Sequence, residues 1–194
     1  MLIFNSFTFH EYSQDESESP PIEIPTEPKN AKAYYFDLAQ MPNDMDFPSK
    51  ERNADFPYYK SEDIPRMVQR VGRTNKEIFG SGRASNIGAI FEGYIEFPAD
   101  GYKLCLRAAD ASELYLDDVF LGIGKTTSAR CFDVEDSSPG VVRRIEMRYK
   151  NMNPNSNVIR LDWKPPGGKS ITLSPYDFLP APVSFIHMHL NIRI

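Results

Sequence analysis

Strict alternation of apolar and polar side chains is the feature that most constrains the fold of this chain. Residues 102–107, 144–149 and 158–163 each place a large apolar residue at every second position. Successive side chains of a strand point to opposite faces, so each segment would have one apolar face and one solvated face. This alternation is typical of antiparallel sheets with one face on a core. The pattern predicts an all-β protein.

Turn-forming residues separate the alternating segments. Pro and Gly mark residues 98–101 and 165–168, Ser, Pro and Gly mark residues 137–140, and Asn recurs between residues 151 and 157. Helical spacing of apolar residues is not sustained over three turns anywhere, and the one weak helix candidate lies near residues 64–71. We therefore predict an antiparallel β-sandwich.

A single tryptophan, Trp163, provides a test of this strand register. It falls on the apolar parity of its segment, and a large aromatic side chain can anchor the space between two sheets. A register error of one residue would turn every side chain to the other face. We predict that Trp163 is buried with Tyr102, Leu104, Leu114, Leu116, Ile145, Met147 and Leu161.

The charge of the chain is unevenly placed. The formal net charge is −5, but residues 1–28 contain six Asp and Glu residues and no Lys or Arg. The rest of the chain therefore sums to +1, which gives no reason to expect nucleic acid as a partner. The same N-terminal segment is rich in Ser and Pro, a composition that cannot bury enough apolar surface to fold alone. We predict an extended acidic arm over residues 1–30.

The C-terminal residues 183–194 follow the predicted sandwich of residues 31–182 and alternate again. Their aliphatic side chains share one parity and would have to be buried, either on the sandwich or as an added strand on a partner. The apolar start of the arm could dock in the same way. The residues predicted to bind a protein partner are Phe7, Phe9, Ile186, Met188, Leu190 and Ile192.

Several features bear on the compartment. No apolar run approaches the roughly 18 residues of a membrane-spanning helix, and the N-terminus lacks the basic region and cleavage site of a signal peptide. The two cysteines, Cys105 and Cys131, are too few for a disulfide scaffold, so free thiols are the default, although the sequence leaves open whether they pair. We predict an intracellular protein, cytoplasmic or cytoskeletal, with an extracellular location as the alternative.

The order of several segments resembles the protective-antigen-type β-sandwich domain (the PA-fourteen family). The sequence AYYFD at residues 33–37 is similar to its opening strand, and FEGYI at 91–95 leads to a Gly-Tyr hairpin at 101–102. ADASELYLDD at 109–118 is similar to its Asp-Asp loop and next strand, and segments at 144–149, 161–168 and 175–179 follow in the same order. The resemblance implies a jelly-roll-like sandwich. The family includes toxin domains, flocculins and adhesins.

One departure from the family pattern concerns calcium. The resemblance implies a loop that presents two consecutive Asp residues to Ca²⁺, and here Ala109 precedes Asp110. Calcium affinity follows the number of charged ligands, so we predict no bound Ca²⁺ at this loop. Asp110, Asn153 and Asn155 remain candidates for a degenerate calcium or glycan loop. In the alternative interpretation, Asp110 is a turn residue that accepts backbone N–H bonds, and the Asn residues form a polar hairpin loop.

Catalysis has little support in the sequence. The histidines His10, His187 and His189 all lie outside the predicted sandwich, so none is placed to serve as a base within it. Two histidines on one strand face are too few to indicate a metal site. The resemblance implies a tight turn at the strand end of Asp117 and Asp118, so we interpret these residues as a turn, with a catalytic acid-base pair as the alternative. The sequence therefore predicts a protein that is not an enzyme, with no cofactor and no metal.

Two functional hypotheses follow. The first is a non-catalytic interaction module, docked through its terminal extensions into a larger intracellular assembly, for which cytoskeletal or ciliary lattices are plausible hosts. The second is a glycan-binding lectin or adhesin module with weak or absent calcium dependence, which rests on the resemblance, since a fold does not determine a function.

Overall fold

The computed structural model describes residues 28–52, 55–64, 69–71, 77, 80–125, 128–153 and 157–182. Two short 3-10 helices lie within these ranges, η1 at Leu38–Gln40 and η2 at Pro175–Asp177. The strands are β1 Ala31–Asp37, β2 Lys60–Ile64, β3 Gln69–Val71, β4 Ile87–Glu96, β5 Lys103–Ala108, β6 Ala111–Leu116, β7 Val119–Lys125, β8 Arg130–Asp133, β9 Val142–Asn151, β10 Asn157–Lys164 and β11 Ile171–Thr172.

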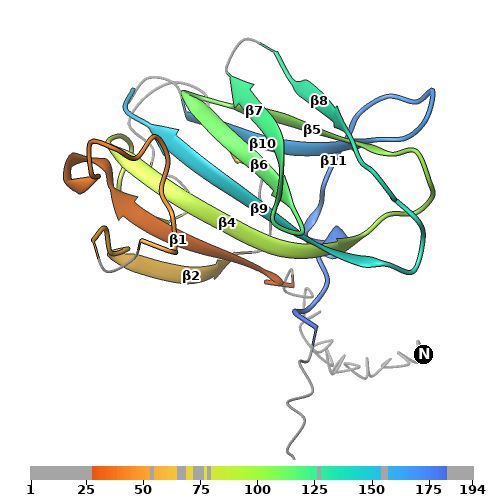
Figure 1. Ribbon diagram of the computed structural model, residues 1–194, viewed down its shortest axis with the longest axis horizontal. Coiled ribbons are helices and arrows are strands. Elements are labelled where there is room, and N and C mark those ends of the chain that lie inside the picture. The colour runs from red at the N-terminus through yellow and green to blue at the C-terminus, as the bar shows by residue number, and fades with distance from the viewer. Residues whose placement is uncertain are drawn as a thin grey trace, which may run out of the picture.

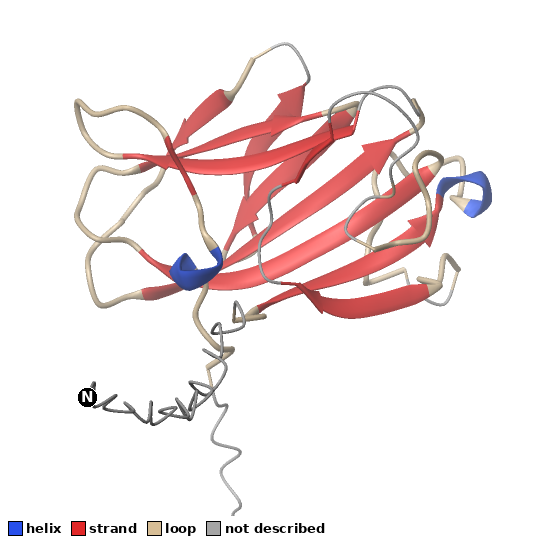
Figure 2. Cartoon of the chain, turned by 180° about the vertical axis from the view of Figure 1, so that it is seen from behind, coloured by secondary structure: helices blue, strands red, loops and turns tan. Residues whose placement is uncertain are grey.

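The strands form two packed antiparallel sheets (Figure 1). The six-stranded sheet has the order β2-β1-β4-β9-β6-β7, and the five-stranded sheet has the order β11-β10-β5-β8 with β3 paired to β10. Strands dominate the cartoon of Figure 2, in which the two sheets lie as layers. This architecture confirms the predicted all-β sandwich.

The predicted core lies between the two sheets. Trp163 is 9% exposed, and its ring centroid lies 5.9 Å from that of Tyr102 and 6.5 Å from that of Phe97. Tyr102 is partly buried against the core, and the other predicted members, Leu104, Leu114, Leu116, Ile145, Met147 and Leu161, are all buried. The alternating pattern therefore predicted both the strands and the faces that they bury.

The weak helix candidate near residues 64–71 is wrong for the residues that the structure describes. Ile64 closes β2, and Gln69–Val71 forms β3, which pairs with β10. The apolar side chain of Ile64 belongs to the main core. The pairing of these short strands with distant partners overrides the local spacing, because tertiary hydrogen bonds outweigh a weak helical preference.

A second, smaller apolar cluster covers part of the outer face of the six-stranded sheet. Phe36 of β1 and Ile90 of β4 are fully buried there under Phe56, and the Phe36 and Phe56 ring centroids lie 5.1 Å apart. Tyr34, Met41 and Met45 pack around them. The connection between β1 and β2 thus folds over this face, which explains why β4 is buried on both sides along its first half.

Charged side chains occupy the rest of that outer face. Glu146 of β9 is 4% exposed and lies between two arginines, with Arg144 Nη2 and Arg148 Nε each 2.7 Å from a carboxylate oxygen. Glu92 of β4 pairs with Arg144 and, at 2.7 Å, with Lys50. Burial opposes ionisation of Glu92, but hydrogen bonds from Lys50 and Arg144 outweigh it and hold the pKa of this carboxyl below its usual value.

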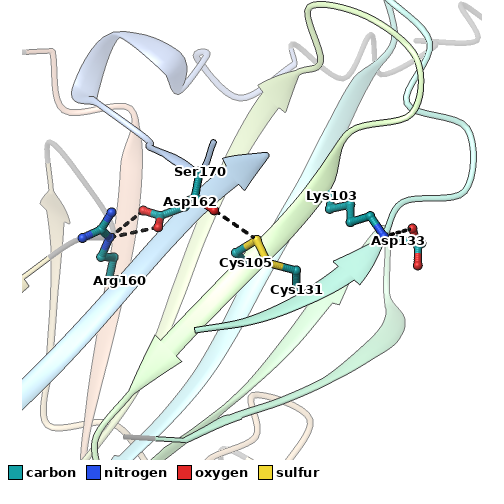
Figure 3. The surroundings of a disulfide bond; sticks show 7 residues. All are labelled: Lys103, Cys105, Cys131, Asp133, Arg160, Asp162 and Ser170. Carbon is teal, nitrogen blue, oxygen red and sulfur yellow. Dashed lines mark hydrogen bonds and ion pairs between the residues drawn. A yellow bond between two sulfur atoms is a disulfide. The ribbon is translucent and has the colours of Figure 1, made fainter. Parts of the chain in front are cut away.

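The two cysteines form a disulfide, so the expectation of free thiols is wrong. Cys105 of β5 and Cys131 of β8 lie directly opposite each other in the five-stranded sheet, with an S–S distance of 1.96 Å. Figure 3 shows the bond on the outer face of this sheet, where Ser170 Oγ lies 3.7 Å from Cys105 Sγ. The reason is register: antiparallel pairing brings two residues 26 positions apart into contact.

The sandwich has two ends that carry different loops. The end toward which β1 and β9 run is called the Asp110 end (Figure 1). Residues 109–110, Lys125 and Asn151–Asn153 meet there. We call the opposite end the Asp117 end, where the Asp117-Asp118 turn and the first residues of β1 and β9 lie.

Candidate functional site

The loop of Ala109 and Asp110 crosses from one sheet to the other. It joins β5 of the five-stranded sheet to β6 of the six-stranded sheet. Ala109 is fully buried and its N–H donates to Val158 O at 2.8 Å, while Asp110 N–H donates to Lys150 O at 3.1 Å. The peptide bond between Ala109 and Asp110 is cis. The loop backbone is therefore held by both sheets.

The carboxylate of Asp110 ties this loop to the one after β9. Its Oδ2 accepts the backbone N–H of Met152 at 2.8 Å, which joins positions 42 residues apart. It forms no ion pair with any residue that the structure describes. Asp110 thus accepts a backbone N–H, as the turn interpretation expects, but the donor belongs to a different loop.

The neighbouring amides divide into buried and exposed ones. Asn151 is fully buried, and its Oδ1 accepts the backbone N–H of Asn153 at 2.8 Å. Asn153 itself is exposed beside this turn. Asn155 lies outside the described residues. The structure therefore brings Asp110 and Asn153 to the same end, and adds Asn151, which sequence reasoning did not single out within the Asn-rich run.

Tyr149 lies on the inner face beneath this loop. Its side chain is fully buried, and its hydroxyl has no hydrogen-bond partner among the described residues. Burial, and secondly the negative charge of Asp110, raise the pKa of this phenol. Tyr149 is therefore neutral at physiological pH.

The described residues of the loop do not fit a calcium site. Ca²⁺ takes six to eight oxygen ligands and depends on their charge. Asp110 is the single carboxylate of the loop, one of its oxygens already accepts the Met152 N–H, and the Asn151 amide oxygen is used by Asn153. More generally, no group of three or more His, Cys, Asp or Glu side chains in the described ranges is placed to hold a metal ion.

An open hollow of about 300 Å³ adjoins the Asp110 loop on the outer face of the six-stranded sheet. Ala111 is paired with Lys125 of β7 on one side and with Lys150 of β9 on the other, so the three side chains form one row. The Lys150 ammonium lies 4.7 Å from the centre of the Phe47 ring. The hollow is lined by Asp46, Phe47, Ala111, Ile123, Lys125 and Lys150.

This hollow was missed by the sequence analysis. Its lining comes from the β1–β2 connection and from three strands, so no short motif carries it. The one local signal is that Lys150 directly follows the alternating segment 144–149 with a cation, and no predicted segment includes Lys125. Such a signal is common on solvated faces and identifies no site.

The Asp117 end differs in both polarity and pairing. Asp117 and Asp118 form the two-residue turn between β6 and β7, with positive φ angles of 47° and 66°, and they pair with Arg143 and Arg144, respectively. This confirms the turn interpretation. Val119 and the neighbouring Phe120 are 63% and 51% exposed and line an open hollow of about 220 Å³.

The terminal extensions leave the sandwich close to each other. Asn30 Nδ2 donates to Phe178 O at 2.8 Å, and Leu179 N–H donates to Tyr94 O at 2.7 Å. Residues on both sides, including Lys29 and Pro180, line one shallow hollow. The predicted partner-binding residues Phe7, Phe9, Ile186, Met188, Leu190 and Ile192 lie outside the described residues. Neither helix in the described ranges has the length and apolar character needed to span a bilayer.

Comparisons with known proteins address the fold. No protein-family model matches the sequence, and no curated protein matches it. Solved structures do match. An anti-sigma factor domain-containing protein has a TM-score of 0.60 at 13% identity, over 80% of this chain and 49% of that one. The chain therefore spans about half the length of that protein.

Two further matches cover most of both chains. The epithelial adhesin 6 A domain from Candida glabrata, solved in complex with Galb1-3GlcNAc, has a TM-score of 0.56 at 9% identity, over 82% of this chain and 90% of that one. The PA14 sugar-binding domain from an RTX adhesin has a TM-score of 0.55 at 13% identity, over 79% of this chain and 99% of that one. At these identities, the comparisons show that this chain has a PA14-like β-sandwich fold.

Proposed function

We propose that this chain is a non-catalytic, calcium-independent glycan-binding module whose site lies at the Asp110 end. The observation that carries this proposal is the open hollow beside the Asp110 loop. Ala111 and Lys150 line the hollow, and the backbone carbonyl of Lys150 accepts the Asp110 N–H. A concave surface with a few convergent polar groups beside apolar ones is typical of small-ligand sites. The fold is shared with domains whose solved structures contain glycans or are described as sugar-binding.

The disulfide supports a working place outside the reducing cytosol. Disulfides persist in oxidising compartments and are rare in cytosolic proteins, and Cys105 and Cys131 are paired. We therefore propose an oxidising compartment for the glycan-binding function, in place of the intracellular location expected from the sequence. Measurement of free thiols in protein isolated from its source under thiol-trapping conditions tests this location.

The pairing of the acidic residues supports a non-catalytic role. General acid-base catalysis by two carboxylates needs at least one of them to exchange protons near the working pH. Asp117 and Asp118 are adjacent in sequence, but each is paired with an arginine in a turn. Asp110 has its carboxylate bonded to the Met152 N–H.

A matched pair of variants in the full chain tests the proposed site. Asp110 and Asp117 each accept one backbone N–H, from Met152 at 2.8 Å and from Arg144 at 2.7 Å, and they lie at opposite ends. On a panel of neutral and acidic oligosaccharides, we expect Asp110→Ala to weaken binding at least tenfold, about 1.4 kcal/mol. Asp117→Ala should bind like the wild type.

Calcium separates the proposal from a lectin that depends on this ion. Binding measured by calorimetry in EDTA and in millimolar Ca²⁺ should give the same affinity. A glycan that binds in Ca²⁺ alone would contradict calcium independence. Wild-type protein that binds no member of the panel in either buffer would contradict the glycan-binding proposal itself.

A second candidate function is docking into a protein assembly through the Asp117 end. The observation that favours it is the exit of both extensions at one place, together with the exposed Val119 and Phe120 at that end. A chain shortened to residues 31–182 should keep its melting temperature and lose partner binding. Unimpaired partner binding by the shortened chain would contradict docking through the extensions.

A further inference from the structure

We propose that the hollow at the Asp110 end recognises an acidic glycan, with Lys125 and Lys150 binding its carboxylate or sulfate group. This inference rests on the glycan-binding function proposed above and specifies the chemical class of its ligand. Four features support it: the placement of the two lysines, the charge that they leave unpaired, the aromatic ring that holds one of them, and the position of one carboxylate beside them.

The two lysines flank a small residue in the floor of the hollow. Ala111 is paired in register with Lys125 and with Lys150, on the two strands next to it. Adjacent strands lie about 4.8 Å apart, so the two lysine backbones are about 10 Å apart and their side chains stand on the same face. The methyl group of Ala111 leaves the space between them open.

The lysine charges are not used within the described part of the chain. Neither Lys125 nor Lys150 forms an ion pair with a described residue. The arginines earlier on β9 differ, because Arg148 donates to Glu146 and Arg144 is paired with Glu92. The cations near the middle of the sheet are thus neutralised, while those at the Asp110 end remain available to a ligand.

The ring of Phe47 holds one of these cations in place. The Lys150 ammonium lies 4.7 Å from the ring centre, within the range of a cation–π contact. Phe47 is 8% exposed, so the ring itself is fixed in the fold. A lysine positioned before the ligand arrives loses less side-chain entropy on binding, which favours its use in recognition.

Asp46 gives the hollow a single carboxylate, which also forms no ion pair with a described residue. A carboxylate accepts hydrogen bonds only, so Asp46 suits the hydroxyl groups of a sugar ring. It repels an anionic group placed next to it. The ligand therefore has to present its acidic group to the lysines and its hydroxyl groups to Asp46, as an acidic sugar can and a simple anion cannot.

Sugar pairs that differ in one acidic group test the inference. The probes are galactose with galacturonic acid, glucose with glucuronic acid, and lactose with 3′-sialyllactose, titrated into the full-length chain and followed by amide NMR shifts. We expect at least one acid to bind about tenfold more tightly than its neutral partner, with shifts at Ala111 and Ile123. Raising NaCl from about 50 to 500 mM should weaken binding of the acid severalfold and leave the affinity for the neutral sugar unchanged.

Variants locate the charge recognition. Lys125→Gln and Lys150→Gln should each lower the acid preference about threefold, and the double variant should abolish it. Lys169→Gln removes the same charge from an exposed loop at the opposite end and should change nothing. Asp46→Asn should strengthen binding of inorganic sulfate and weaken binding of the acidic sugar.

The outcomes separate this inference from the glycan-binding proposal. Equal binding of acidic and neutral sugars overturns the acidic specificity and leaves glycan binding in place. An acid preference that survives in the Lys125→Gln, Lys150→Gln double variant overturns the role of these lysines. Binding of no sugar of any pair overturns both proposals.

Discussion

The two ends of the sandwich carry aspartate turns that are alike in sequence and different in their surroundings. Asp117 at one end accepts the Arg144 N–H and pairs with Arg143, while Asp118 pairs with Arg144. Asp110 at the other end accepts a backbone N–H and meets no cation among the described residues. The difference shows that the role of a turn carboxylate depends on what the neighbouring strand presents to it.

The unpaired charges and apolar groups are distributed in opposite ways. The Asp110 end leaves two lysines and one aspartate without ion pairs in the described chain, around an open hollow. The Asp117 end pairs its aspartates and exposes Val119 and Phe120. A polar ligand suits the first end and an apolar protein surface suits the second. This contrast underlies the two functions proposed above, and the following predictions test it in order of decreasing effect.

The largest effect is expected at the core of the Asp117 end. Trp163→Ala removes a ring packed against Phe97 and Tyr102, and it should lower the free energy of unfolding by about 3–5 kcal/mol in urea titrations. Ile171→Ala on the neighbouring strand, where Ile171 is 54% exposed, is the control and should cost far less. A similar loss in both variants would show that this end is not anchored by the tryptophan.

The disulfide gives the next effect and belongs to neither end. Cys131→Ser opens a covalent loop of 26 residues, and loop-closure entropy predicts a loss of about 3.5 kcal/mol. Thermal melting with and without reductant measures it. Reductant should lower the melting temperature of the wild type and leave that of the variant unchanged. A wild type insensitive to reductant would contradict a stabilising bond.

The two aspartates compare the ends directly. Asp117→Ala should cost about 2 kcal/mol, since it breaks hydrogen bonds to Arg143 and Arg144 and leaves Ala at a positive φ angle. Asp110→Ala loses one hydrogen bond from Met152 and should cost about 1 kcal/mol. Chemical denaturation of both variants ranks them. The reverse order would mean that Asp110 has the larger structural role and would weaken the case for a binding site there.

The charged face between the ends should respond to pH. Hydrogen bonds from Lys50 and Arg144 lower the pKa of Glu92, so its carboxylate stabilises the fold at neutral pH. This contribution is fully present above the ordinary pKa of a glutamate and is lost as the pH falls through the lower pKa of the folded state. Glu92→Gln should cost about 1.5 kcal/mol at pH 7. The difference in unfolding free energy between Glu92→Gln and the wild type should disappear in acid. A difference that does not change with pH would contradict stabilisation by the ionised carboxylate.

The smallest effect is expected inside the Asp110 end. Tyr149→Phe deletes a buried hydroxyl that has no hydrogen-bond partner among the described residues. Removing an unsatisfied group costs nothing in hydrogen bonding, so stability should stay within about 0.5 kcal/mol of the wild type or rise slightly. A loss above about 1 kcal/mol would show that the hydroxyl is bonded in solution and helps to hold the Asp110 loop.

Much of the fold was predictable from the sequence because alternation is a local property. The buried parity of residues 145, 147 and 149 and of 159, 161 and 163 follows from the strand period of two. The Asp117-Asp118 turn was predictable from the resemblance, which implies a tight turn at this strand end, and it joins the adjacent strands β6 and β7. The helix candidate at residues 64–71 failed where the local pattern was weak and distant strand pairing decided.

The candidate site was predictable only in part. The position of Asp110 came from a resemblance of sequence order, and its backbone acceptor role was one of two interpretations. The rest of the site depends on the register of strands that are far apart in the chain. This holds for the hydrogen bond from Met152 to Asp110, for the hollow beside Phe47, and for the row of Lys125, Ala111 and Lys150. No spacing within one segment carries that information.

The sequence by itself determined the strands of the alternating segments and which face of each is apolar, because both follow from neighbours two positions apart. The tertiary structure alone decided which distant residues lie side by side: Cys105 with Cys131, Asp110 with Met152, and Lys125 with Lys150 across Ala111. The physical reason is that strand order and register arise from packing two whole sheets together. These choices set which charges are neutralised and which remain available to a ligand.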